Sequence, residues 1–217
     1  MTKSSQNELT NKHGVSLKTR NLSCSRNDVV LISGLEFSIS EGQLLLVEGP
    51  NGSGKTTLLK TICGLIEPDE GEIMWRDHHI SSMMEEYLAE LNYVGHHNGI
   101  KLALTVVENL KTAMALASVN CTDKLDPVLD LFGLDAYKET SAQLLSSGLR
   151  RRLALARLAT CAARLWVLDE PFTSLDTEGR YVIKGLFQDH MNSGGIIVMT
   201  SHDDIDMDGT SIVRIHL

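Results

Sequence analysis

The chain has 217 residues, of which 42% are hydrophobic and 22% charged, a composition typical of a globular domain long enough to build a core. Its formal net charge of −8 argues against a general nucleic-acid binder, so we expect no nucleic acid among its partners. The four cysteines are scattered and form no CxxC pair, which favours a reducing compartment over a disulfide framework.

The first sixteen residues are polar and predict a loose tail, so that the folded domain is expected at residues 17–217. No apolar run approaches the roughly 20 residues that cross a bilayer. We therefore expect that the chain does not enter a membrane by itself.

The N-terminal third is rich in short β-type segments. Apolar and β-branched patterns predict strands at 16–24, 35–40, 43–49, 71–80 and 91–97. The segment 56–65 has helical spacing, and Gly64 is a suitable end for that helix.

The middle of the chain is predominantly helical in pattern, and we expect a helical subdomain at about 80–160. Helices are predicted at 106–118, 124–134, 141–145 and 150–163. Two continuous apolar strands follow, at 164–171 and 194–202. Such strands alternating with helices predict an α/β fold with a parallel sheet covered on both faces.

The segment Gly49–Thr56 (GPNGSGKT) fits the phosphate-binding pattern G-x-x-x-x-G-K-[ST], and it lies between an apolar strand and a helix as that pattern requires. Lys55 is expected to reach the β- and γ-phosphates, and the Thr56 hydroxyl to ligate Mg²⁺. The sequence therefore predicts a P-loop NTPase core. The nucleotide-binding residues expected in this loop are Gly49, Pro50, Asn51, Gly52, Ser53, Gly54, Lys55, Thr56 and Thr57.

Polar side chains end both apolar strands, where α/β folds place their chemistry. Asp169 is expected to hold Mg²⁺ through its water shell, and Glu170 to polarise the attacking water as a general base. His202 ends the second strand. A single histidine is more often structural, but this position downstream of Glu170 makes His202 a candidate catalytic residue.

The segment Gln143–Arg152 (QLLSSGLRRR) has the features of a second phosphate binder. Two serines and a glycine stand where a loop becomes a helix, and three arginines follow on the first helical turns. Helix N-termini attract anions through their free N–H groups. Because the P-loop already provides a phosphate site, the second one needs its own explanation.

Taken in order, these motifs resemble the set found in ABC-transporter ATPases: GPNGSGKT, LSSG from Leu145, LWVLDE from Leu165, SLD from Ser174, and His202. The resemblance implies an ABC ATPase core with a β-rich N-terminal edge and an α-helical subdomain, which binds and hydrolyses ATP with Mg²⁺. It also implies a head-to-tail homodimer. In that dimer Ser146, Ser147 and Gly148 serve the partner's nucleotide, Asp176 links the two subunits, and His202 senses the γ-phosphate.

The chain departs from the family pattern at four positions. The signature usually has the sequence LSGGQ, and here Ser147 and Leu149 replace a glycine and the glutamine. The glutamine of the loop that contacts Mg²⁺ falls on His96, which when neutral could still contact the ion or its water. The aromatic residue that stacks on adenine falls on Arg26, whose planar guanidinium can also stack on a base.

From Leu17 to the C-terminus the chain is similar to the CcmA group, the ATP-binding subunits of haem exporters in bacterial cytochrome c maturation. The similarity rests on the segments 33–75, 95–110 and 151–176. It implies a membrane subunit like CcmB, further proteins like CcmC, CcmD and CcmE, and a place on the cytoplasmic face of the inner membrane. Neighbouring histidines do not share a face, so we expect no direct haem contact at the pairs 78–79 and 96–97.

Other ABC assignments remain open. The chain could serve another ABC importer or exporter, or be a SufC-like ATPase that works on an iron–sulfur scaffold and not on a membrane protein. DNA- or ribosome-associated ABC ATPases carry long coiled coils or tandem motif sets, and the sequence has neither.

Overall fold

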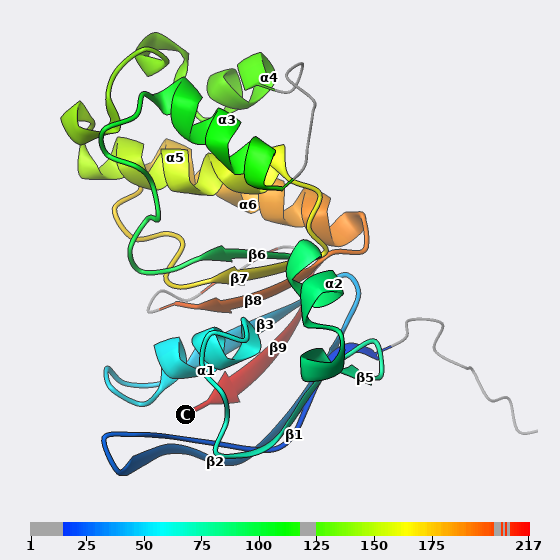
Figure 1. Cartoon of the computed structure of the whole chain (residues 1–217). Coiled ribbons are helices and arrows are strands. Elements are labelled where there is room, and N and C mark those ends of the chain that lie inside the picture. The colour runs from blue at the N-terminus through cyan, green and yellow to red at the C-terminus, as the bar shows by residue number, and fades with distance from the viewer. Residues whose placement is uncertain (1–14, 118–124, 202–204, 206, 208) are drawn as a thin grey trace, which may run out of the picture.

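The structure is a computed structural model that describes residues 15–117, 125–201, 205, 207 and 209–217, with the backbone alone at 15 and 16 (Figure 1). Most of the expected N-terminal tail and His202 therefore lie outside the described residues. The first strand begins at Val15, two residues before the expected start of the folded domain.

A parallel five-stranded sheet forms the centre of the molecule, with strand order β6-β7-β8-β3-β9. Its strands are β3 (Gln43–Glu48), β6 (Leu91–Val94), β7 (Leu165–Leu168), β8 (Ile196–Thr200) and β9 (Ser211–His216). Leu44 and Leu46 of β3 face one hydrophobic core, while Leu45 and Val47 face another. Burial on both faces explains why these strands are continuous apolar runs.

The second sheet is antiparallel, with order β2-β1-β4-β5. It comprises β1 (Val15–Arg26), β2 (Val29–Ser40), β4 (Glu70–Trp75) and β5 (His78–His79). The turn between β1 and β2 consists of Asn27 and Asp28, with φ of 50° and 62°, the geometry that two-residue hairpin turns require. This sheet covers α1 (Lys55–Ile62) from below in Figure 1.

Helices cover the opposite face of the parallel sheet (Figure 1). They are α3 (Val106–Leu116), α4 (Leu125–Leu131), α5 (Ser147–Thr160) and α6 (Thr177–Asn192), while α2 (Met84–Ala89) lies beside β6. Short 3-10 turns occur at Ile80–Ser82, Asp135–Tyr137 and Ala142–Leu144. Strand β6 is an edge strand of the parallel sheet, and the helices on the opposite face begin at Val106.

The P-loop NTPase α/β architecture predicted from the sequence is confirmed by these two sheets and their helices. Within the part of the chain that the structure describes, no helix combines the length and the apolar character needed to cross a bilayer.

Candidate functional site

The phosphate-binding loop connects β3 to α1. Gly49, Gly52 and Gly54 have φ of 142°, 87° and 105°, which residues with side chains rarely adopt. At Gly49 a Cβ would also lie 2.7 Å from the Leu217 carbonyl oxygen. The glycines of the motif are therefore required by the path of the backbone.

Lys55 lies back over this loop. Its Nζ donates to the carbonyl oxygens of Gly49 at 2.7 Å and Pro50 at 2.9 Å. The Oγ of Ser53 in the same loop is buried and has no hydrogen-bond partner among the described residues. The lysine is thus held as a fixed positive charge at the mouth of the loop.

Asp169 follows β7 and is 3% exposed. Its Oδ2 accepts a 2.9 Å hydrogen bond from Thr56 Oγ1, and its Oδ1 accepts one of 2.8 Å from Thr200 Oγ1. The two expected Mg²⁺ ligands, Thr56 and Asp169, are therefore neighbours, although 113 positions separate them in the sequence.

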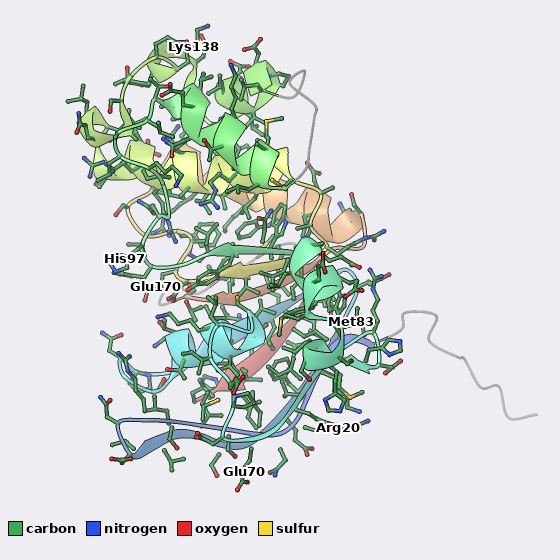
Figure 2. All side chains as sticks on the ribbon, viewed as in Figure 1. Arg20, Glu70, Met83, His97, Lys138 and Glu170 are labelled. Carbon is green, nitrogen blue, oxygen red and sulfur yellow. The ribbon has the colours of Figure 1, made fainter. Side chains whose placement is uncertain are left out.

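Glu170 lies at the edge of the sheet where β6 and β7 end (Figure 2). Its φ of 50° places it in the left-handed region, which costs a residue with a side chain roughly 1–3 kcal/mol. Its N–H donates to Thr200 Oγ1 at 2.9 Å, and its Oε2 accepts from Thr173 Oγ1 at 3.2 Å. The backbone at Glu170 is therefore strained, as backbone at functional sites often is.

Two cavities meet at the two carboxylates. The first, of about 220 Å³, is lined by Arg26, Leu31, Asn51, Gly52, Gly54, Lys55, Thr56, Thr57, Asp169 and Glu170. The second, of about 170 Å³, is lined by His96, Asn98, Ser147, Arg151, Asp169, Glu170, Thr173 and Ser174. The structure thus brings Arg26 to the P-loop, as expected, but His96 lies at the far side of the carboxylates.

The segment Gln143–Arg152, the second one expected to bind phosphate, contains the start of α5. Ser146 is the N-cap, with its Oγ accepting from the Leu149 N–H at 3.2 Å. A Cβ on Gly148 would lie 3.0 Å from the Ser174 carbonyl oxygen, so this turn packs closely on the segment after Glu170. Ser146 and Ser147, at the N-terminus of the helix, are exposed, as are Gln143 and Leu144 before it.

The three arginines of this segment do not extend the anion site, contrary to the expectation from their sequence. Arg150 donates to the Gln143 carbonyl at 2.9 Å, and Arg152 contacts Asp176 at 2.6 Å. Arg151 is 4% exposed and turns into the protein. Burial lowers the pKa of Arg151, against the opposing effect of the Asp169 and Glu170 charges.

Asp176 is the N-cap of α6, because its Oδ1 accepts from the Gly179 N–H at 3.0 Å. The hydrogen bond from Arg152 is the largest of the effects that lower the pKa of this carboxyl. The residue expected to link two subunits therefore already has two partners in its own chain.

Sequence reasoning missed several residues in and around the site, among them Thr200, Leu31 and Tyr93. Thr200 bridges Asp169 and Glu170, but it is the last residue of an apolar strand and carries no motif signal. Leu31 lines the P-loop cavity from β2. Burial, with the nearby Asp169 charge, raises the pKa of Tyr93 to about 12.

Comparison with known proteins agrees with this geometry. Residues 32–173 match the ABC transporter family. The cytochrome c biogenesis ATP-binding export protein CcmA of Nitrosospira multiformis is 44% identical over 90% of this chain and 96% of that protein. CcmA of Aliivibrio fischeri is 41% identical over 93% and 98%, respectively. A solved ABC transporter ATP-binding protein from Pyrococcus furiosus superimposes with a TM-score of 0.79 at 25% identity, covering 93% of this chain and 97% of that one.

Both resemblances inferred from the motifs are thereby confirmed. The chain belongs to the ABC transporter family, as one of its ATP-binding ATPase subunits, and within that family to the cytochrome c biogenesis export proteins CcmA.

Proposed function

We propose that this CcmA-type subunit hydrolyses ATP to drive the haem export step of cytochrome c maturation. The observation that carries the proposal is the convergence of Lys55, Thr56, Asp169 and Glu170 on one cavity at the ends of parallel strands. The similarity to proteins named as cytochrome c biogenesis export proteins supports haem export over a role in another ABC importer or exporter.

The residues present fit a magnesium nucleotide. Thr56 Oγ1 and Asp169 Oδ2 are oxygen ligands 2.9 Å apart, the donor type that Mg²⁺ takes beside substrate phosphates. When bound, the ion would neutralise charge on the phosphate oxygens. Lys55 and the loop N–H groups would bind the β- and γ-phosphates, while Arg26 would stack on the base.

Glu170 would accept a proton from the attacking water, since a carboxylate at the edge of the cavity can reach the γ-phosphate side. His96 lines the second cavity on the other side of Glu170 and would contact the ion or its water only from there. His202 would be the γ-phosphate sensor, a role that the resemblance to ABC ATPases implies.

We further propose that two copies form a head-to-tail dimer. Ser146, Ser147 and Gly148 present a helix N-terminus that would bind the γ-phosphate held by the partner's P-loop. The Asp176 side chain, 64% exposed, would lie at the same interface while it remains paired with Arg152.

ABC ATP-binding subunits work with membrane partners, and we propose here a CcmB-like subunit, with CcmC-, CcmD- and CcmE-like proteins, at the cytoplasmic face of the inner membrane. The contact surface we propose is the loop at residues 96–105, where Leu102 is 49% exposed. Asn109 holds the loop in place, because its amide bonds to the backbone of Lys101, Leu104 and Thr105.

Complementation tests this function. In a bacterium that lacks its own CcmA, the chain should restore c-type cytochromes and fractionate with membranes that contain the CcmB-like subunit. A charge at the contact loop, Leu102→Glu, should leave ATP hydrolysis within about twofold of wild type yet lower c-type cytochromes. Normal cytochrome levels in that variant would remove the loop from the contact, whereas recovery of the chain with a soluble iron–sulfur scaffold would favour the SufC-like alternative.

A further inference from the structure

Arg151, the middle arginine of the segment Arg150–Arg152, has every one of its donors engaged. Its Nε donates to the Pro171 carbonyl at 3.3 Å. Its Nη1 donates to the Gly95 carbonyl at 3.0 Å and to Asn98 Oδ1 at 3.1 Å. Its Nη2 donates to the carbonyls of Asp169 at 2.8 Å and Glu170 at 2.7 Å. A guanidinium has five N–H groups, and here five acceptors surround it.

These acceptors belong to two segments of the site, and Arg151 itself starts from a third. Three are the consecutive carbonyls of residues 169–171, at the end of β7. The other two belong to the loop after β6, which also carries His96. One buried side chain of α5 therefore connects that helix with residues 169–171, the carboxylate segment, and with the loop after β6.

The carboxylate segment needs such support because Glu170 is in the left-handed region, with φ of 50°. Its N–H is held by Thr200 Oγ1 at 2.9 Å, and its carbonyl is held by Arg151 at 2.7 Å. Backbone anchors on both sides fix the direction in which the carboxylate leaves the chain. A lysine could not replace the arginine, because an ammonium offers its donors from a single point and not as a planar fork.

We propose that Arg151 is a positioning residue for hydrolysis: it sets the orientation of Glu170 and ties that orientation to the loop Gly95–Asn98. The proposal rests on the proposed role of Glu170 as the base. It also assigns a path by which a displacement of this loop would reach the carboxylate, through one guanidinium.

Arg151→Lys tests the proposal. We expect kcat to fall about ten- to a hundredfold, as misplacement of a catalytic group does, with ATP affinity within threefold of wild type because the P-loop is untouched. Arg157→Lys is the matched control. Arg157 is on the same helix and, among the described residues, donates to the carbonyls of Asn98 and Gly99 and not to the carboxylate segment, so this variant should keep at least half of the wild-type kcat.

A merely structural role predicts a different pattern, in which kcat follows thermal stability. Melting temperatures of both variants are therefore measured, and rates are compared well below them. The proposal would be overturned if the two variants lost the same fraction of kcat and their melting temperatures fell by the same amount.

If Arg151→Lys does not accumulate as folded protein, Asn98→Ala tests the network from its loop end, and we expect a two- to fivefold lower kcat at unchanged ATP affinity. An unchanged kcat in Asn98→Ala would then overturn the proposal.

Combination with Glu170→Gln separates this inference from the proposed function. If Arg151 acts through Glu170, Arg151→Lys should lower the residual rate of Glu170→Gln by less than twofold. If Arg151→Lys lowers the rate by the same factor in the Glu170→Gln background as in wild type, the inference is contradicted, while Glu170 remains the base. A wild-type rate in Glu170→Gln alone would instead contradict the proposed role of Glu170 as the base.

Discussion

The P-loop and the start of α5, the two regions expected to bind phosphate, differ in how much of a site each contains. At the P-loop, Lys55, Thr56, Asp169 and Glu170 converge on one cavity of about 220 Å³. At the start of α5, the nearest described cavity contains Ser147 and Glu170 but no residue of the P-loop. The first region gathers a lysine and two carboxylates around one cavity, whereas the second brings a helix N-terminus to a cavity that also includes Asp169 and Glu170.

Charge sharpens this difference. Lys55 is directed at the P-loop, where a phosphate would lie. The arginines after Gly148 instead bond to carbonyls and to Asp176 of their own chain. The second region therefore contributes backbone N–H groups without a directed cation, which suits a contact that completes a site whose charge comes from another molecule.

The largest effect should follow from Lys55→Ala, which breaks the complete region. A buried hydrogen bond to a charged group contributes about 1.5–3 kcal/mol, so ATP affinity should fall by one to two orders of magnitude or become undetectable. Binding is measured with a fluorescent ATP analogue. Affinity within threefold of wild type would remove Lys55 from the role given to it.

Glu170→Gln should separate binding from chemistry in the same region. The amide cannot accept a proton, so hydrolysis should fall at least tenfold while ATP still binds. The ATP-loaded dimer should then accumulate on a sizing column. Turnover above about a tenth of wild type would mean that Glu170 is not the base.

A smaller effect is expected from Gly148→Ala in the incomplete region. The new Cβ would lie 3.0 Å from the Ser174 carbonyl oxygen, closer than most real contacts, so the turn must shift by a few tenths of an ångström. Hydrolysis should fall about three- to tenfold with ATP binding to the variant's own P-loop unchanged. A drop in ATP affinity would instead indicate that the two regions form one site within the same chain.

Most of the fold could be predicted because its signals are local. The buried strands β3, β7 and β8 are continuous apolar runs, and the glycine pattern marks the P-loop. Helix α6 and strand β9 were missed, although Asp176 at the N-cap and the spacing of Ile183, Phe187 and Met191 are helix signals.

The site was predictable only where a motif names the residue. Lys55, Thr56, Asp169 and Glu170 meet as expected. The sequence places Arg151 in an anion site because three adjacent arginines look alike, and only tertiary packing decides which of them is buried. Thr200 could not be found for a similar reason, since its two hydrogen bonds reach residues some 30 positions away.

The most direct test of the account is a mixture of two inactive variants. Ser146→Arg should block the space where the partner's γ-phosphate lies and leave the variant's own P-loop intact. Lys55→Ala instead keeps residues 146–148, the signature turn, intact. Each homodimer should be inactive. A mixed dimer would pair one intact P-loop with one intact signature turn, so we predict that mixing restores activity, at most about half that of wild type. Because neither subunit has both parts, a signature turn that acts within its own chain predicts no recovery. No activity after mixing, with mixed dimers shown to form, would contradict the account.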